Sequence, residues 1–551
     1  MALALSAPLV AQPTYAFDPI LFEPPAPDGR IDAPLVYDPT DRRLYMFGGQ
    51  SSGFLNDLWA YSFDQAAWTQ LQPAGTPPAG RRGHTMVFDA MRRRLIVFGG
   101  QARGFFNDVW EYDLAANTWT EIASVGRRPN TRYGHSGITD TMRDRMVISH
   151  GFTDAGRFDD TWSFDFATNT WTEISPTMRP LRRCLHHAVH DPNRDQMLLF
   201  GGCASGVGPC PLDDFWAFDL ETHTWTQLPR EPPGRQFYGT AFDIEMDRMV
   251  VFGGDGNGGR LDDVWEYDPA ADTWRALAVS DPRPSARSRH QGQFIPGMGI
   301  VFFGGNAAEG RTNQLWRFSL AQAPEVTQAG VGNAFNFEGG SVAPGEIVSL
   351  FVRNGGPRRG VSSQFGADGV LPFEIAGVTV TWNGMPSPAY FASDGQLNVQ
   401  IPYEKATESE VELVIDFRGQ SSGPVNLPVV ASKAGLFPVV FNQDGSINSE
   451  QNPAPPESII IVFVTGQGVT SPPSPTGAYP MDGIFPEPVA EVTVEIGGDA
   501  AETLFMGQAP FTAGVMQLNA RLGSATGSRV ILIRIGQAVS QAGVVVWVQT
   551  P

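Results

Sequence analysis

Short apolar segments followed by polar turns recur along the first 320 residues of the chain. Such β-branched and aromatic segments, separated by turn residues, predict β-strands, and no window shows the 3.6-residue periodicity of a long amphipathic helix. We therefore expect an all-β protein. Five of the segments end in Phe-Gly-Gly, at Phe47-Gly48-Gly49, Phe98-Gly99-Gly100, Phe200-Gly201-Gly202, Phe252-Gly253-Gly254 and Phe303-Gly304-Gly305, and Ser149-His150-Gly151 fills the remaining place in the series.

Tryptophan pairs follow these segments with the same period of about fifty residues, which is typical of a propeller built from four-stranded blades. Six units are present, and we expect each to form one antiparallel blade. The first tryptophan of each unit is Trp59, Trp110, Trp162, Trp216, Trp265 or Trp316, and a second lies nine residues later in five units, at Trp68, Trp119, Trp171, Trp225 and Trp274.

The sixth unit lacks its second tryptophan, because position 325 is Glu. In most units an arginine follows the second tryptophan after thirteen residues, and counting thirteen back from Arg30 leads to Phe17. We therefore predict that a strand around Phe17 completes the sixth blade. Such closure joins the two ends of the ring and removes an exposed sheet edge.

The glycine pairs, the tryptophan spacing and the openings Arg81-Arg82-Gly83-His84 and Arg132-Tyr133-Gly134-His135 resemble kelch repeats. The resemblance covers residues 15–320 and implies a six-bladed kelch propeller. Function on such a scaffold resides in loops and rims rather than in the repeat itself.

The last third of the chain, from residue 321, contains a quieter repeat. Val378-Thr379-Val380-Thr381-Trp382 returns as Val492-Thr493-Val494-Glu495-Ile496, and Gln396-Leu397-Asn398 returns as Gln517-Leu518-Asn519. This duplication predicts two immunoglobulin-like β-sandwich modules, at residues 321–433 and 434–551. The segment from Ala434 to Gly468 also resembles an uncharacterised C-terminal domain family of exported acidobacterial proteins, which implies export and identifies no functional residues.

The formal net charge of −20 argues against a nucleic-acid partner, because phosphates would be repelled. The sequence contains no apolar run of about 20 residues, which a membrane-spanning helix would need. Residues 1–14 are interpreted as a remnant signal peptide or a disordered tail, so we expect an extracellular or cell-surface protein.

Six arginines hold the same register in the six units and are the first candidate for a ligand site. In kelch propellers this position begins the innermost strand near one mouth of the channel, where guanidinium groups can bind carboxylates or phosphates. The alternative is a structural role, with each arginine paired to acidic or carbonyl groups of a neighbouring blade. These arginines are Arg30, Arg81, Arg132, Arg183, Arg235 and Arg287.

A second ring follows three residues after these arginines. Its imidazoles could meet near one axis, but histidine at this position can also hydrogen-bond to the backbone, and we predict neither a metal site nor a cofactor. The ring comprises Ala33, His84, His135, His186, Tyr238 and His290.

Cysteines are few, and two of the three bracket a glycine-rich loop. Cys203 and Cys210 can form a small disulfide in an oxidising compartment, which leaves Cys184 as a buried thiol. The loop between them is the longest of its kind in the six units. It is either a recognition element or a tolerated insertion.

The leading functional hypothesis is a secreted or surface-displayed binding protein whose propeller face takes an anionic glycan or a protein partner. The alternative is an extracellular enzyme, carbohydrate-active or an oxidase, with an active site on that face. No catalytic motif or catalytic residue is identified, so a non-enzymatic role is preferred. A purely structural role in a matrix is the third possibility.

Overall fold

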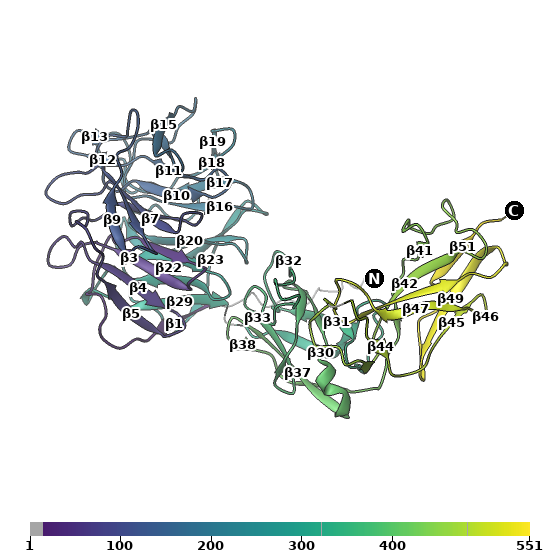
Figure 1. Cartoon of the computed structure of the whole chain (residues 1–551). Coiled ribbons are helices and arrows are strands. Elements are labelled where there is room, and N and C mark those ends of the chain that lie inside the picture. Colours follow the sequence, from purple (N-terminus) through teal and green to yellow (C-terminus); the bar gives the residue numbers. More distant parts are fainter. Residues whose placement is uncertain (1–14, 321, 482, 551) are drawn as a thin grey trace, which may run out of the picture. The chain divides into compact units, whose positions relative to one another are not determined.

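The computed structural model describes residues 15–320, 322–481 and 483–550. They form two compact units, Met1–Ala321 and Gln322–Pro551, each of which is described by itself (Figure 1). Both units are built from strands, and the one helical element among the described residues is the short 3-10 helix η1 (Tyr403–Thr407). The all-β prediction is confirmed. The tail predicted for residues 1–14 lies outside the described residues.

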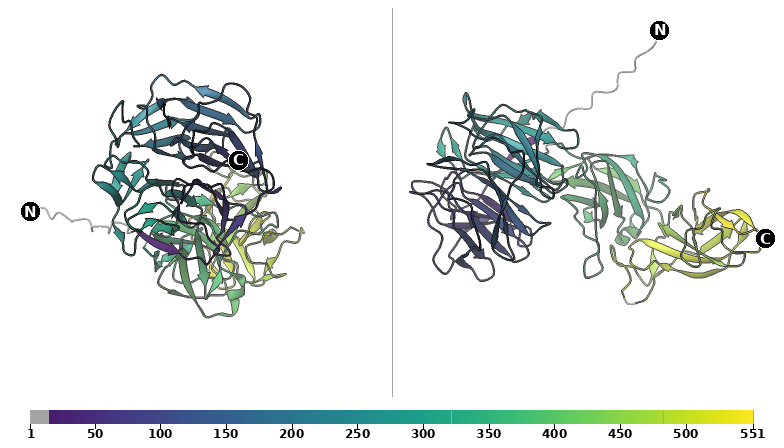
Figure 2. Two further views of the ribbon diagram at one scale, coloured as in Figure 1. Left: turned by 90° about the vertical axis from the view of Figure 1, so that its left-hand side faces the viewer. Right: turned by 90° about the horizontal axis from the view of Figure 1, so that it is seen from above.

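Six sheets of the first unit are its propeller blades (Figure 2, purple to teal). Two further sheets are short hairpins, β12 (Phe152–Thr153) with β13 (Gly156–Arg157) and β27 (Asn306–Ala307) with β28 (Gly310–Arg311). The first three sheets are β2 (Leu35–Asp38), β3 (Arg43–Phe47), β4 (Leu58–Ser62) and β5 (Ala67–Leu71); β6 (Thr85–Asp89), β7 (Arg94–Phe98), β8 (Val109–Asp113) and β9 (Thr118–Glu121); and β10 (Ser136–Asp140), β11 (Arg145–Ser149), β14 (Thr161–Asp165) and β15 (Thr170–Ile174). The next two are β16 (His187–Asp191), β17 (Gln196–Phe200), β18 (Phe215–Asp219) and β19 (Trp225–Leu228); and β20 (Gly239–Asp243), β21 (Arg248–Gly256), β22 (Gly259–Asp268) and β23 (Thr273–Ala276).

The sixth blade is shared between the two ends of the first unit. Its strands run β25 (Gln291–Ile295), β26 (Gly299–Phe303), β29 (Leu315–Leu320) and β1 (Tyr15–Ile20), and β24 (Val279–Ser280) lies beside β1. Strand β1 is antiparallel to β29, with Phe17 opposite Phe318. The innermost strands β2, β6, β10, β16, β20 and β25 contact one another in this order, and β25 contacts β2, so the ring is closed.

Aromatic side chains fill each interface between consecutive blades. The phenylalanine before each glycine pair packs against the second tryptophan of the next blade, with ring centroids 4.9 Å apart for Phe47 and Trp119 and 4.8 Å apart for Phe98 and Trp171. Phe17 occupies the place of the missing tryptophan, is 1% exposed and lies 4.9 Å from Phe252. Burying such rings supplies much of the hydrophobic stabilisation of the interfaces.

The glycine pairs lie where two blades come into close contact. Gly48 and Gly49 both have positive φ angles, which favour glycine. A Cβ atom on Gly49 would lie 2.7 Å from the Cβ atom of Ala33 in its own blade, and one on Gly48 would lie 2.9 Å from the carbonyl oxygen of Arg81 in the next. The pair therefore permits both a left-handed turn and a close approach of backbones.

A closed ring of six backbone hydrogen bonds encircles one end of the central channel. Each member donates its N–H to the carbonyl of the equivalent residue in the preceding blade, over distances of 2.6–3.1 Å. All six have φ angles between 53° and 63°. The members are Asp32, Gly83, Gly134, Leu185, Phe237 and Arg289.

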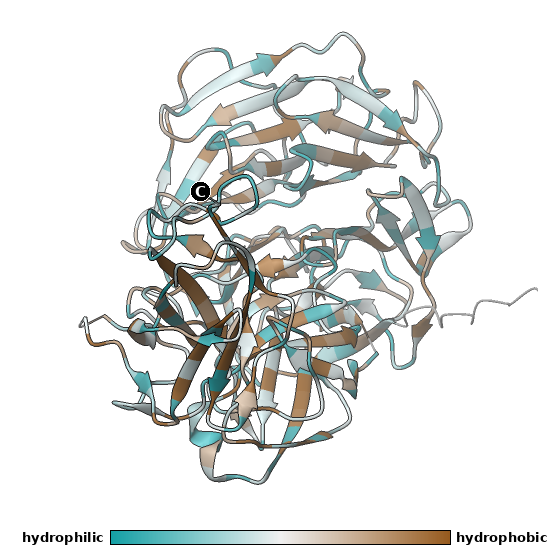
Figure 3. Ribbon diagram, turned by 90° about the vertical axis from the view of Figure 1, so that its right-hand side faces the viewer, coloured by the Kyte–Doolittle hydropathy of each residue, from teal (hydrophilic) through white to brown (hydrophobic). Residues whose placement is uncertain are grey.

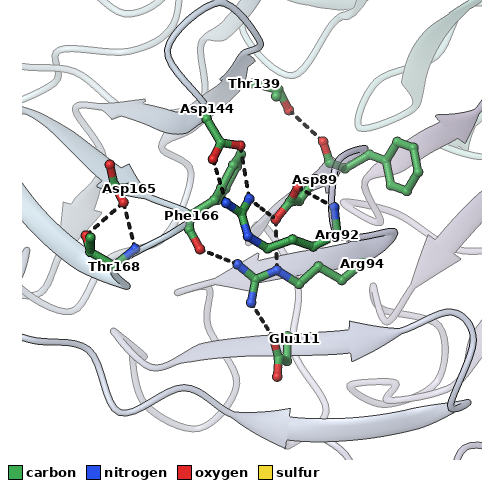
Figure 4. Close-up of polar contacts among 10 residues, drawn as sticks. Asp89, Arg92, Arg94, Glu111, Thr139, Asp144, Asp165, Phe166 and Thr168 are labelled. Carbon is green, nitrogen blue, oxygen red and sulfur yellow. Dashed lines mark hydrogen bonds and ion pairs between the residues drawn. The ribbon is translucent and has the colours of Figure 1, made fainter.

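Ion pairs join consecutive blades at the other end of the innermost strands (Figure 4). Arg92 donates to Asp89 of its own blade at 3.0 Å and to Asp144 of the next blade at 2.7 Å. Arg143 and Arg194 repeat this arrangement one and two blades further on. Between the first two blades the charges are reversed, with Arg93 donating to Asp41 at 2.6 Å.

The second unit consists of two modules, each with two main sheets whose strand orders match except at β32 and β41, and a short sheet of β43 (Thr470–Ser471) and β44 (Glu487–Pro488) accompanies the second module. The first module has β30 (Glu325–Asn333), β31 (Ile347–Arg353), β36 (Gln396–Gln400), β35 (Ala389–Ala392) and β32 (Val361–Ser362) in one sheet, and β34 (Met385–Pro386), β33 (Val378–Trp382), β37 (Glu410–Phe417), β38 (Gln420–Ser421) and β39 (Val425–Pro428) in the other. The second has β40 (Gly435–Leu436), β41 (Phe441–Asn442), β42 (Ile459–Thr465), β48 (Val515–Arg521) and β47 (Thr503–Gln508), and β46 (Asp499–Ala500), β45 (Val492–Ile496), β49 (Gly527–Ile535), β50 (Ala538–Val539) and β51 (Val545–Val548).

Alternating strand residues place the apolar side chains of each module between its two sheets. In Figure 3 the brown, apolar residues lie mainly on strands, whereas the connecting loops are mostly white and teal. In the second module the buried residues come from both sheets, including Val462 and Leu518 from one and Ile533 and Val546 from the other. Two β-sandwiches therefore follow the propeller, and the sequence duplication corresponds to this repeated strand order.

We expect Phe17→Ala to destabilise the first unit by about 3–5 kcal/mol, because it leaves a cavity where β1, which completes the sixth blade, packs against the fifth blade. Urea denaturation followed by tryptophan fluorescence measures the effect. Leu21→Ala is the control, since Leu21 lies four residues away and is 80% exposed. Equal stability of the two variants would show that β1 does not contribute to closure.

Candidate binding site

The six arginines in register lie inside the protein rather than at its surface. Each is at most 2% exposed. Arg81 shows the common pattern: its guanidinium donates to both carboxylate oxygens of Asp108, at 2.7 and 2.8 Å, and to the carbonyl oxygens of Gly99 and Ala79. Trp110 donates its indole N–H to the same carboxylate at 2.8 Å. The side chains are therefore buried and paired, as the structural alternative expects, but Asp108 belongs to the same blade as Arg81 and not to the next one. The hypothesis that they bind a ligand has no geometric support.

The same arrangement recurs in five blades. The other four pairs are Arg30–Asp57, Arg132–Asp160, Arg183–Asp214 and Arg235–Asp263. Burial alone would raise the pKa of Asp108, but the hydrogen bonds from Arg81 and Trp110 outweigh burial and hold that pKa below its ordinary value. Asp108 is thus the ionised partner of a buried cation.

Arg287, in the sixth blade, lacks such a carboxylate. Its guanidinium donates to the side-chain oxygen of Gln314 at 2.9 Å, and Glu309 lies 3.9 Å away. Burial lowers the pKa of Arg287 to about 10, and the distant Glu309 opposes this effect only in part. Gln314 also accepts the indole N–H of Trp316 at 3.2 Å, so it occupies the aspartate position of the other blades.

The second ring also packs between blades. Its members with rings are His84, His135, His186, Tyr238 and His290, and each is at most 6% exposed. The His84 ring lies edge-on to Phe47 of the preceding blade at 5.5 Å, and His135 lies likewise against Phe98 at 5.3 Å. Burial lowers the pKa of His135 to about 3, so this imidazole is neutral. Among the described residues, no group of three or more His, Cys, Asp or Glu side chains is placed to hold a metal ion.

His150 compensates for the loss of one phenylalanine. Ser149 stands at the phenylalanine position, and His150 follows with a φ of 61° where the other blades have glycine. Its ring lies 5.3 Å from His186 and 6.1 Å from Trp225, the contacts that phenylalanine makes in the other blades. His150 is fully buried, and burial lowers its pKa to about 3.

Arginines and aromatic rings surround the hydrogen-bonded ring at one mouth of the channel. Arg82 lies over the rings of Tyr133 and Phe54, at 5.3 and 6.0 Å, and Arg289 lies over Phe237 at 3.5 Å. Arg289 also donates to Asp32 at 2.9 Å. We call this set the loop-face cluster; it comprises Phe54, Arg82, Phe105, Tyr133, Phe152, Arg157, Phe237 and Arg289.

The cluster continues into the third and fourth blades. Phe105 and Phe152 meet edge to face at 5.9 Å, and Arg157 lies over Phe152 at 5.3 Å. Arg157 then reaches the loop of the fourth blade, where it donates to the carbonyl oxygens of Cys203, at 3.0 Å, and Ser205. Cys203 and Cys210 are joined by a disulfide, and Cys184 is a buried free thiol.

A cavity of about 520 Å³ occupies the channel between its two ends. All six innermost strands line it, and it extends from the hydrogen-bonded ring to the hairpin turns at the opposite end. The residues that follow the innermost strands at those turns are mostly apolar: Pro39, Ala90, Thr141, Pro192, Ile244 and Pro296.

The sequence analysis did not identify the loop-face cluster. Its members lie in loops of several blades, and Arg82 stands one position after the arginine that holds the register. Variation within the repeat was the available signal: the position after the register arginine is Ile31, Arg82, Tyr133, Cys184, Gln236 or Ser288. A repeat position whose residue changes from blade to blade is free to carry recognition chemistry.

Comparison with known proteins supports the propeller assignment. The model of the "KLHDC2/KLHL20/DRC7 Kelch-repeats domain" matches residues 16–180 and 176–324. The chain is 32% identical to "Adagio protein 3" of Arabidopsis thaliana over 290 residues, covering 48% of this chain and 46% of the relative. It is 28% identical to "Leucine-zipper-like transcriptional regulator 1" of Homo sapiens, covering 46% of this chain and 31% of the relative.

A third similarity covers more of the relative. The chain is 29% identical to "Kelch domain-containing protein 3" of Rattus norvegicus, covering 48% of this chain and 75% of that protein. The chain spans about half the length, or less, of the first relatives it matches. A search of the described residues for a helix long and apolar enough to cross a membrane found none.

We expect Gln314→Asp to stabilise the first unit by about 1 kcal/mol, because a charge-assisted pair replaces a neutral hydrogen bond to buried Arg287. Asp108→Asn should destabilise it by about 3–5 kcal/mol, because Arg81 loses its counter-charge. Thermal unfolding of both variants checks the two opposite signs. Destabilisation by Gln314→Asp would show that Arg287 is satisfied without a carboxylate.

The free energy of unfolding should fall as the pH drops below about 6.5, the ordinary histidine pKa. Because buried His135 and His150 have folded-state pKa values of about 3, the unfolded chain binds protons first and is favoured. Each such histidine contributes up to about 1.4 kcal/mol per pH unit. Urea titrations between neutral and mildly acidic pH measure the slope.

The double variant Ser149→Phe/His150→Gly restores the sequence of the other blades and removes one buried histidine. The slope of its free energy of unfolding against pH should be smaller than that of the wild type, by an amount that corresponds to about one bound proton. An unchanged slope would show that His150 does not remain neutral in the folded protein.

Proposed function

We propose that this chain, which belongs to the KLHDC2/KLHL20/DRC7 Kelch-repeats domain family, is a protein-interaction scaffold that binds its partner through the loop-face cluster. The family match supports the propeller as an interaction module. The choice of face rests on one observation: arginines and aromatic rings from five blades meet around the same mouth, and the fourth blade contributes its disulfide-closed loop.

The composition of the cluster suits a protein surface. Phenylalanine, tyrosine and arginine are enriched at protein interfaces, and the two aromatic residues give a large contact area at a small cost in conformational entropy. Phe54 is 36% exposed, and Phe105, Phe152 and Arg82 are partly exposed. These rings present apolar area that solvent already reaches.

The charge of the cluster indicates the kind of partner. Within the loop-face cluster, Arg82, Arg157 and Arg289 carry three positive charges, and Asp32 accepts from Arg289, on a chain whose net charge is −20. A locally positive mouth on an acidic protein favours a partner segment that combines acidic and apolar side chains. We therefore prefer a protein ligand to an acidic glycan, which lacks the apolar component.

An extracellular or cell-surface location completes the proposal. The disulfide between Cys203 and Cys210 supports it, because disulfides persist mainly in oxidising compartments. The two sandwich modules would then serve as a spacer or an anchor for the propeller.

Selection of binders from a random-peptide display library on the full chain tests the proposed face. Enriched peptides should carry acidic and apolar residues, and Arg82→Ala or Phe105→Ala should weaken their binding by about 10-fold or more. Met91→Ala is the control, because Met91 is 77% exposed in a hairpin turn at the opposite end of the channel.

Fluorescence anisotropy with the labelled peptides measures affinity, and thermal unfolding shows whether each variant is folded. Peptides that bind both cluster variants as well as the wild type would overturn the choice of face. Binding to an array of acidic glycans, with no peptide enriched, would favour a glycan ligand instead.

A further inference from the structure

All three cysteines of the 551-residue chain lie together in the fourth blade. Cys203 and Cys210 form the disulfide, with Cα atoms 4.4 Å apart. Cys184, although 19 residues before Cys203, lies directly opposite it as an antiparallel bridge partner. Three sulfur atoms in one place, of which two are bonded and one is free, allow the bond to move.

The bridge gives Cys184 and Cys203 a fixed mutual position. Each donates its backbone N–H to the carbonyl of the other, at 3.1 and 2.8 Å. Cα atoms of such a hydrogen-bonded pair lie about 5.5 Å apart, within the range of about 4.4–6.8 Å that a disulfide spans. Directly opposite residues also project from the same face of the pair. A disulfide between Cys184 and Cys203 is therefore compatible with the backbone as it stands.

A guanidinium group lies beside these sulfur atoms. One terminal nitrogen of Arg157 lies 3.7 Å from Sγ of Cys203, and Nε of Arg157 donates to the Cys203 carbonyl oxygen at 3.0 Å. Burial raises the pKa of the Cys184 thiol, and Arg157 opposes that effect. A positive charge at this point stabilises the thiolate that attacks a disulfide.

We propose that the three cysteines form a thiol–disulfide exchange site, in which the Cys184 thiolate attacks Sγ of Cys203 and displaces Cys210. The bond between Cys203 and Cys210 breaks as the bond between Cys184 and Cys203 forms. Cys184 releases its proton to solvent before the attack, and the departing Cys210 thiolate takes up a proton from solvent afterwards. The number of disulfides is unchanged, so the step consumes no oxidant or reductant.

Exchange changes what the loop presents to solvent. Cys203 and Cys184 are 4% and 2% exposed, whereas Cys210 lies at the surface. The product therefore carries an exposed free thiol at Cys210, and the loop 204–209 is no longer closed on itself. That this alters partner binding rests on the proposed function, since Arg157 connects the loop to the loop-face cluster; the exchange itself does not.

The first test uses the full chain with Cys210→Ser, refolded with a glutathione redox buffer. Peptide mapping without reduction should find Cys184 linked to Cys203. The control is Cys184→Ser, which should retain the bond between Cys203 and Cys210. Recovery of Cys184 and Cys203 as separately alkylated thiols in a folded Cys210→Ser protein would overturn the proposal.

The second test follows the wild-type protein, which needs no variant to fold. Iodoacetamide at mildly alkaline pH should label Cys210 progressively, and Cys184→Ser should reduce that labelling by roughly 10-fold or more. Arg157→Ala should slow it as well, whereas the surface substitution Arg103→Ala should not. Label found on Cys184 alone would show that the thiol becomes accessible without exchange.

The same samples separate this inference from the proposed function. Labelled and unlabelled protein are compared for binding of the selected peptides. Exchange without a change in affinity would contradict the regulatory consequence and leave the exchange site standing. Absence of exchange with intact peptide binding would overturn the site and leave the proposed function standing.

Discussion

Contact between consecutive blades is the constraint on which the propeller depends. A single four-stranded sheet cannot bury its own apolar faces, so each blade must be covered by the blades before and after it. Here the cover is a repeated aromatic contact, from Phe47 against Trp119 to Phe252 against Phe17. Because the first and sixth blades must also cover each other, stability requires that the ring be complete. Phe303 against Trp68 makes this last contact, and the N-terminal strand completes the sixth blade and packs against the fifth.

Charge plays a second part at the same interfaces. Buried arginines such as Arg81 fix the loop that carries the aspartate and the first tryptophan of their blade, while their backbones bond to the preceding blade. Isolated buried ion pairs add little net stability, but they penalise every arrangement that separates them. The hydrophobic contacts hold the blades together, and the ion pairs define their register.

Sequence periodicity was sufficient for the repeated features of the fold and insufficient for the local ones. The glycine pairs, the tryptophan spacing and the position of Phe17 all follow from counting residues, because each blade solves the same packing problem. The environment of the arginines could not be predicted from residue spacing alone. Asp57 and its counterparts stand two positions before the first tryptophan, but spacing alone does not show that these carboxylates turn inward. The proximity of Cys184 to Cys203 depends on a strand pairing that no sequence pattern announces.

At the channel mouth, six residues with positive φ angles share one backbone arrangement but carry different side chains. Their backbone bonds are the same in every blade, yet the side chains are an acid, two glycines, a leucine, a phenylalanine and an arginine. The N–H and carbonyl groups make the same bonds whichever side chain is present, but not every exchange is possible, since a Cβ atom on Gly83 would clash with the Tyr133 ring. The mouth thus presents different side chains on one repeated backbone frame, and two of them, Asp32 and Arg289, are paired with each other. A new specificity could therefore arise at the four positions that already carry side chains, by substitutions that leave the backbone ring intact.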